Sequence, residues 1–224
     1  KTFRPRHKRE LTREQLSKAM RIITVIKEKR NGVLKGRSCV DGRPQRAYIS
    51  KEEAASPTTS LDSLLITLLI DAWEKRDVAT ADVVGAYLNA YMEDFVVVKL
   101  VGDEVDIISN LNPVYKEYII VENGKKVLYL QLIKALYGCI KSALLWYECF
   151  TNCLFEMGFK LNKHDQCVAN KMIEGSQCTI VWYVDDNKIS HASSKVVDEI
   201  IEAIEKKFGK MTVKRGKEHV FVGM

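Results

Sequence analysis

The stretch Cys178-Thr-Ile-Val-Trp-Tyr-Val-Asp-Asp-Asn-Lys-Ile-Ser-His191 places two adjacent carboxylates, Asp185 and Asp186, between two apolar runs. This pattern predicts a strand over 180–184, a tight turn carrying both acids, and a second strand over 188–190. Negative charge concentrated in one turn is costly without a cation, and Mg²⁺ prefers oxygen ligands of this kind. Since acidic pairs also occur in ordinary exposed turns, the rest of the sequence has to decide between a metal site and a solvated turn.

The composition is that of a globular chain with a real core. The 224 residues are 46% hydrophobic, which suggests one or two domains. No apolar run reaches the length of a membrane span, and no secretory signal opens the chain, so we expect no membrane partner. The six cysteines form no CxxC pair and are interpreted as reduced thiols of an intracellular protein. A zinc site at Cys167 and Cys178 is the alternative, but their spacing matches no usual zinc pattern.

Positive charge is concentrated at the start of the chain. Residues 1–46 hold 15 of the 35 Lys and Arg residues but only 4 of the 29 Asp and Glu residues. The remainder is slightly acidic. Such a basic region suits a polyphosphate partner, either nucleic acid or nucleotide. The alternative for residues 1–9 is a solvated basic tail.

The apolar periodicity predicts an α+β chain: a sheet with helices on one side, preceded by a basic hairpin. Residues 1–10 are expected to be disordered or peripheral. A capping box at Thr12 starts a helix to about Arg21, and Asn31-Gly32 turns a hairpin. Residues 102–126 look like a loop-rich insertion. Further strands are expected at 22–26, 33–40, 76–83, 95–100, 127–132 and 220–224, and helices at 61–75 (lying in the core), 142–157 and 195–208.

A third acid would complete the chemistry that the acidic turn suggests. Phosphoryl transfer to a growing strand uses two metal ions about 3.5–4 Å apart, bridged by carboxylates from different backbone elements. Asp82 ends an apolar strand immediately before a turn, and turning backbone can direct amides at a phosphate. A metal hydrolase with an acidic cluster would also use such groups, but it does not explain the motifs that follow.

Five motifs, in order, resemble those of reverse transcriptases of copia-type (Pseudoviridae) retrotransposons over about residues 20–224. The motif that begins at Lys35 is similar to a basic segment of the family's fingers. The motif that begins at His219 is similar to the start of the family's primer grip. Asp82-Val-Val-Gly-Ala-Tyr87-Leu-Asn resembles the first catalytic motif, and Tyr183-Val-Asp-Asp186 the second. The five are Lys35-Gly-Arg37 with Gly42 and Gln45-Arg46; the Asp82 motif; Leu132-Ile-Lys-Ala-Leu-Tyr-Gly-Cys-Ile-Lys-Ser142 with Trp146-Tyr147; the Tyr183 motif; and His219-Val-Phe-Val-Gly-Met224.

The resemblance implies a reverse-transcriptase palm, an antiparallel sheet backed by helices, with a basic fingers subdomain. It implies a basic segment at 1–10, fingers over 11–80 with palm elements toward their end, and palm over 81–224 with a residual fingers segment. Together these make a single reverse transcriptase domain that ends at the start of the primer grip. A complete enzyme continues into a thumb and an RNase H domain, which we expect to be absent from this chain.

The implied reaction is RNA-directed DNA synthesis, with two Mg²⁺ ions (or Mn²⁺) held by Asp82, Asp185 and Asp186, joined by the Val83 carbonyl. Asp186 either coordinates a metal ion directly or supports the other two acids. Tyr87 resembles the steric gate that excludes a ribose 2′-OH. The remaining implied contacts to dNTP are the backbone of Val84, Gly85, Ala86 and Tyr87, the side chain of Arg37, a second cation from either Lys29 or Arg30, and Tyr137.

The resemblance also implies contacts to template and primer. Ser142 is expected to cap the following helix and touch the template side, whereas Trp146 and Tyr147 are interpreted as core. Lys206, Lys207 and Lys210 lie where the family often has a lysine that protonates pyrophosphate, but none is assigned. The implied nucleic-acid contacts are Gly138, Ser142, Tyr183, Val184, Phe221, Val222, Gly223 and Met224.

The implied partners are an RNA or DNA template, a DNA or tRNA primer, dNTP, and other domains of one polyprotein, with integrase upstream and RNase H downstream. We expect location in a cytoplasmic virus-like particle or in the nucleus. Two departures from the family pattern stand out: Ala143 replaces the usual proline, and Gly36-Arg37-Ser38-Cys39 replaces an apolar segment. The alternative function is a truncated or domesticated nucleic-acid-binding remnant without catalysis.

Overall fold

The computed structural model describes residues 1–28 and 32–223. The chain divides into two compact units, each made of two segments. Unit 1 comprises Lys1–Ala55 and Ala90–Leu145, and unit 2 comprises Ser56–Asn89 and Trp146–Met224. The boundaries that the sequence suggested, at residues 10 and 80, do not coincide with this division, because the chain leaves unit 1 and returns to it.

Unit 1 is built on a six-stranded sheet in the order β1-β7-β5-β2-β3, with β6 also paired to β7. The pairings are antiparallel except for a short parallel contact between β2 and β5. The buried core lies on β5 and β7, as in Val98, Leu128 and Leu130. The strands are β1 (Phe3–Arg6), β2 (Met20–Glu28), β3 (Leu34–Val40), β5 (Val97–Val101), β6 (Ile120–Glu122) and β7 (Lys125–Leu132).

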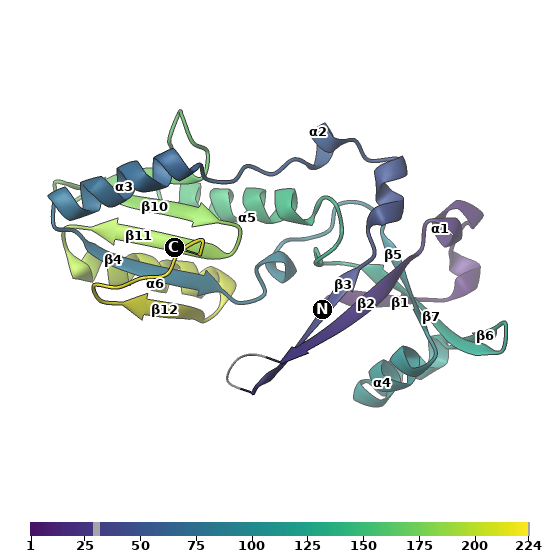
Figure 1. Cartoon of the computed structure of the whole chain (residues 1–224). Helices are drawn as coiled ribbons and strands as arrows, with labels where there is room; N and C mark the ends of the chain where they lie inside the picture. The colour runs from purple at the N-terminus through teal and green to yellow at the C-terminus, as the bar shows by residue number, and fades with distance from the viewer. Residues whose placement is uncertain (29–31, 224) are drawn as a thin grey trace. The chain divides into compact units, whose positions relative to one another are not determined.

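The predicted basic hairpin is confirmed in unit 1. Strands β2 and β3 pair from Ile22↔Val40 to Glu28↔Leu34, and Figure 1 shows them as a long two-stranded ribbon. The turn predicted at Asn31-Gly32 lies mostly outside the described residues. The helix predicted after Thr12 is also confirmed at its start, where the Thr12 and Gln15 side chains form a capping box. It ends earlier than expected, since α1 covers only Arg13–Ser17.

Two expectations for unit 1 are wrong. The N-terminal segment is an ordered strand, because β1 pairs with β7 and Arg6 donates to the Gln131 side chain at 2.6 Å. Residues 102–126 are mainly regular structure, in which Val105 and Tyr115 are buried in the core of unit 1. The helical elements of unit 1 are η1 (Lys8–Glu10), α1, η2 (Arg43–Ala47), α2 (Lys51–Ala54), α4 (Asp103–Leu111) and η4 (Pro113–Tyr118).

Unit 2 is a sheet of six antiparallel strands in the order β12-β4-β11-β10-β9-β8. Alternate residues of a strand face opposite sides. Ile180 and Trp182 of β10 pack on α5 and α6, and Val181 between them packs with Leu64 of α3. The strands are β4 (Asp77–Val83), β8 (Lys160–Leu161), β9 (Val168–Ile173), β10 (Ser176–Tyr183), β11 (Asp186–His191) and β12 (Met211–Arg215).

Helices therefore cover both faces of this sheet, with α3 on one face and α5 and α6 on the other (Figure 1). The prediction of helices on one side only is wrong. So is the prediction that α3 lies in the core: only three of its residues, Leu64, Thr67 and Asp71, are buried, and Trp73 is 89% exposed. The helices of unit 2 are α3 (Leu61–Trp73), η3 (Ala86–Asn89), α5 (Ser142–Glu156, which begins in unit 1) and α6 (Ser194–Phe208).

The predicted ends of α5 and α6 agree with the structure. Gly158 and Gly209 follow these helices with φ of +83° and +87°, which glycine adopts without strain. The C-terminal prediction is wrong, because residues 220–223 form no strand. The sixth strand is instead β12, whose polar, exposed pattern gives little sequence signal.

Candidate active site

The two acids lie at the hairpin between β10 and β11. Tyr183 pairs with Asp186, so Val184 and Asp185 form a two-residue turn. Val184 has φ of +58°. A β-branched residue rarely adopts this conformation, which costs on the order of 1–3 kcal/mol. The sequence predicted the turn but not its backbone strain. Because such strain persists only where other groups enforce it, surrounding groups must hold this turn in place.

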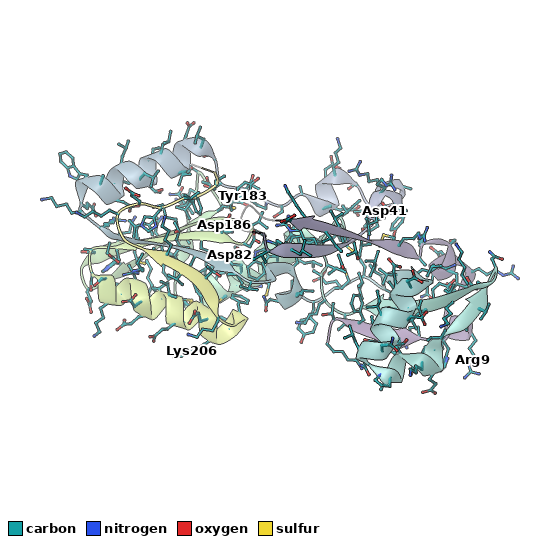
Figure 2. The ribbon with its side chains drawn as sticks, turned by 60° about the horizontal axis from the view of Figure 1, so that its bottom comes forward. Arg9, Asp41, Asp82, Tyr183, Asp186 and Lys206 are labelled. Carbon is teal, nitrogen blue, oxygen red and sulfur yellow. The ribbon has the colours of Figure 1, made fainter. Side chains whose placement is uncertain are left out.

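Asp82 lies beside the acidic turn, as predicted. It is the register partner of Asp186 across β4 and β11, and Figure 2 shows the two residues together with Tyr183 at one end of the sheet. Asp82 and Asp186 project from the same face as Thr80, because residues two apart on a strand share a face. Acids far apart in the sequence thus converge through strand register.

The three carboxylates influence one another electrostatically. Partial burial raises the pKa of Asp186, and the negative charges of Asp185 and Asp82 raise it further. Asp186 still reaches solvent, so this shift concerns a site open to ligands. Like charges gathered at one point are stabilised by a cation, and carboxylate oxygens suit a hard divalent ion.

The three carboxylates are suitable ligands for such an ion and lie at the same end of the sheet. Their side chains do not, however, form a coordination site as they stand. Within residues 1–28 and 32–223, no three His, Cys, Asp or Glu side chains are close enough together to hold a metal ion. Electrostatic coupling reaches several ångströms, whereas Mg²⁺ coordination requires about 2.0–2.1 Å. Binding therefore requires the acidic side chains to turn toward one another.

Buried groups fix the backbone of the turn. The Val83 N–H donates to the Asp185 carbonyl at 3.1 Å, and the Asn187 side-chain amide donates to the same carbonyl at 2.9 Å. The Trp146 indole N–H donates to the Val184 carbonyl at 2.6 Å. Trp146 is buried, which confirms its interpretation as core, but sequence reasoning missed its polar contact and missed Asn187 entirely. The sequence did carry a signal for Asn187: a polar residue stands directly after the acids, where an apolar strand residue is expected.

Tyr87 lies near the acids on the short helical turn η3. Burial raises the pKa of its hydroxyl, with further contributions from Asp185 and Tyr183, so the phenol is neutral at ordinary pH. The chain enters η3 through Gly85, whose φ is +66°, and the Leu88 N–H closes the turn on the Gly85 carbonyl at 2.8 Å. Val84 is exposed and Ala86 is fully buried. The predicted nucleotide contacts of 84–87 remain predictions.

The predicted nucleotide-binding side chains of unit 1 are exposed. Arg37 lies on β3 opposite Val25, and Tyr137 is 36% exposed. Lys29 and Arg30 lie outside the described residues. Gly138 has φ of +94°, and a Cβ there would meet the Val40 carbonyl oxygen at 1.9 Å. The loop carrying Tyr137 therefore depends on a glycine at this close approach to β3.

A family model described as "Reverse transcriptase (RNA-dependent DNA polymerase)" matches residues 14–224. The chain belongs to the reverse transcriptase family. It is accordingly an RNA-directed DNA polymerase, a nucleotidyltransferase whose family acts on a nucleic-acid template and primer with nucleotide substrates, and generally with divalent metal ions, typically Mg²⁺. A search of the curated proteins finds no match.

Ser142 has an internal position in this reverse transcriptase. Its hydroxyl accepts from the Leu136 N–H at 3.1 Å and donates to the Leu136 carbonyl at 2.7 Å, and the residue is 1% exposed. It is the first residue of α5 and not a cap of the helix N-terminus. The hydroxyl thus closes the 136–142 loop on itself, and the template contact of Ser142 stays a prediction.

The predicted primer-grip residues divide into buried and exposed ones. Phe221 is 7% exposed and packs with Leu64, Val168 and Val181 under α3, and its nucleic-acid contact stays a prediction. Val222 and Gly223 form an exposed turn with φ of +52° and +79°. Met224 lies outside the described residues. At the hairpin, Tyr183 is 39% exposed and Val184 is half-buried, so both stay available.

Unit 2 also contains a cavity of about 730 Å³ that is separate from the acids. It lies between α3 and the C-terminal residues, and its lining includes Leu68, Asp71, Lys188 and Phe221 but none of the three acids. Its size alone does not make it the reaction site. Among the described residues no helix is long and apolar enough to cross a membrane.

Proposed function

We propose that this chain is the polymerase of a copia-type retrotransposon polyprotein, adding deoxynucleotides to a primer 3′-hydroxyl. The observation that carries the proposal is the register of Asp82 with Asp186, beside Asp185, in a chain of the reverse transcriptase family. The copia assignment rests on the segment from Leu132 to Ser142 with Trp146-Tyr147. Integrase and RNase H regions of the same polyprotein, and location in a cytoplasmic virus-like particle or in the nucleus, belong to this proposal.

In this reaction the primer 3′-oxygen forms a bond to the α-phosphorus of dNTP, the bond to the β-phosphate oxygen breaks, and pyrophosphate leaves with the electron pair. Asp82, Asp185 and Asp186 would hold two Mg²⁺ or Mn²⁺ ions, with the Val83 carbonyl as a further ligand. When bound, such ions favour deprotonation of the 3′-hydroxyl and neutralise charge on the phosphates. The chain itself supplies a fixed backbone from which the acids can reach a bound ion.

The family resemblance supports roles for several side chains in selecting and orienting the nucleotide. The neutral Tyr87 ring would exclude a 2′-hydroxyl by its bulk. Arg37 would bind phosphate oxygens through its planar guanidinium. Tyr137 would lie against the nucleotide and Gly138 against the template, with the 84–87 backbone facing the triphosphate.

The test is Mg²⁺-dependent extension of oligo(dT) on poly(rA) by the parent chain and by Asp185→Asn. Because Asn cannot supply the negative charge, the substitution is expected to reduce extension by at least about 1,000-fold. Asp62→Asn, an exposed carboxylate at the start of α3 in the same unit, is the matched control and should extend normally.

Extension by Asp185→Asn at the parental rate would overturn the assignment of the acids. If the parent shows salt-sensitive nucleic-acid binding that Asp185→Asn leaves unchanged, and neither extends, the result favours the non-catalytic binding module over the polymerase.

A further inference from the structure

The conformation of the acidic turn requires a restraint. Val184 is β-branched and has φ of +58°, and its half-buried side chain packs against the apolar core of unit 2. Strain of this kind persists only where the surrounding structure enforces it, and it gathers at functional sites. The groups that enforce it are therefore candidates for a role in the reaction.

Trp146 provides one restraint, from a different element. Its indole N–H donates to the Val184 carbonyl at 2.6 Å, and Trp146 is 2% exposed. The indole cannot easily move, because its ring packs against Phe150 at 5.4 Å and against Phe208 at 5.0 Å between ring centroids. A hydrogen bond in such a buried place is stronger than one in water. The aromatic core between α5 and α6 thus reaches the strained residue directly.

Asn187 provides the second restraint, on the neighbouring residue. Its amide donates to the Asp185 carbonyl at 2.9 Å and to the Ala81 carbonyl at 3.3 Å, which ties the turn to β4. Asn187 is 1% exposed, and within the described part of the chain its own side-chain oxygen has no hydrogen-bond partner. A buried amide oxygen left unpaired is costly, so the two donated bonds are the reason for a polar residue here.

We propose that Trp146 is a positioning residue for the polymerase reaction, which holds Asp185 in place through the backbone of Val184, with Asn187 fixing the Asp185 carbonyl. The proposal rests on the proposed function of Asp185. Trp146 touches neither nucleotide nor metal in this scheme. It acts by holding the backbone of the turn, so that the Asp185 side chain starts from a fixed position when it turns toward Asp82.

The test compares Trp146→Phe with Phe150→Leu. The first keeps a ring in the core but removes the N–H donor. The second disturbs the same core and leaves the donor. Trp146→Phe is expected to lower kcat about 10–100-fold with KM for dTTP nearly unchanged. It should also weaken Mn²⁺ binding by about tenfold, measured by electron paramagnetic resonance without substrates. Phe150→Leu should lower Tm at least as much and leave both quantities near the parental values.

A rescue variant addresses the strain itself. Glycine adopts a positive φ without cost, so a turn carrying Val184→Gly needs less restraint. In that background Trp146→Phe should lower kcat by less than about threefold, a non-additive result that loss of core packing alone does not give.

If Trp146→Phe and Phe150→Leu reduce kcat and Mn²⁺ binding alike, Trp146 is only a core residue and the inference fails. Asp185→Asn in the same assays keeps this separate from the proposed function. If Asp185→Asn retains extension and Mn²⁺ binding, the function of the acids is what fails. If the parent does not extend the primer, Mn²⁺ titration of the parent, Trp146→Phe, Phe150→Leu and Asp185→Asn still decides the role of Trp146.

Discussion

The two sheets differ in how many polar side chains they bury beside their apolar core. The sheet of unit 1 has an apolar interior, with Val98, Leu128 and Leu130 completely buried. The central strands of unit 2, in contrast, bury polar residues: Thr80, Thr179, Asn187, Lys188, Ser190 and His191. Buried polar groups stabilise a fold only when they are paired. Both units have an apolar core, but unit 2, which carries the candidate active site, also buries polar groups whose cost depends on specific partners.

This difference has a physical consequence for the acidic turn. Apolar contacts do not specify orientation closely, whereas a hydrogen bond fixes both distance and direction. The buried donors Trp146 and Asn187 are what hold the acidic turn, and they are part of the polar interior of unit 2. Four further predictions sharpen or break this contrast between the units.

The largest effect is expected at Lys188, whose ammonium is buried and paired with Asp71 of α3. Burial lowers the pKa of Lys188, while Asp71 opposes that shift. Lys188→Met leaves Asp71 without its nearest partner and should reduce the free energy of unfolding by about 3–5 kcal/mol. The double variant Lys188→Met with Asp71→Leu should recover most of this loss. Urea unfolding measures both, and additivity of the two single effects would show that the pair is not coupled.

The next effect separates the two faces of α3. Leu64 is 2% exposed and packs on the sheet of unit 2, whereas Leu69 is 70% exposed. Leu64→Ala should cost about 2–5 kcal/mol, and Leu69→Ala should stay within about 0.5 kcal/mol. Thermal unfolding of the two variants tests this. Equal destabilisation would mean that α3 is buried all round, as its composition first suggested.

A smaller effect is expected at the close approach in unit 1. Gly138→Ala would bring a Cβ to 1.9 Å from the Val40 carbonyl oxygen, whereas Gly124→Ala meets open space at a similar positive φ of +74°. Because backbone strain is common to both, the difference isolates the collision. Gly138→Ala should be less stable than Gly124→Ala by about 1–3 kcal/mol in the free energy of unfolding. Indistinguishable variants would show that the loop moves freely from β3.

The smallest effect concerns Glu122, where unit 1 does rely on charge. Hydrogen bonds from Lys8 and Lys99 lower the pKa of its carboxyl from 4.5 to about 2. A lowered carboxyl pKa stabilises the fold above about pH 4.5, and this contribution is lost as the pH falls through about 2. Discounting for solvent screening, Glu122→Gln should cost about 1 kcal/mol at pH 7. Urea unfolding at pH 7 and pH 3 should show a smaller difference between parent and variant at pH 3; a constant difference would exclude a titrating contribution.

Much of the local structure follows from the sequence. The hairpin of β10 and β11, the capping box at Thr12 and the glycines after α5 and α6 are decided by neighbouring residues, and the structure agrees with them. The motif around Asp82 and the Tyr183–Asp186 turn indicated a reverse transcriptase, and the family match over residues 14–224 confirms that assignment. Periodicity and turn chemistry act over a few residues, so they can be recognised without the fold.

Only the tertiary structure decided which side chains are exposed for binding and which are used in contacts inside the protein. Ser142 and Phe221 seemed suited to nucleic acid but are buried, and the N-terminal segment became a strand because β7 offers it a partner. The bond from Trp146 to Val184 joins residues 38 positions apart. Such contacts depend on which segments meet in three dimensions, and composition or spacing along one chain carries no information on that meeting. The sequence therefore identified the acids, whereas the fold determined which groups hold the turn that carries them.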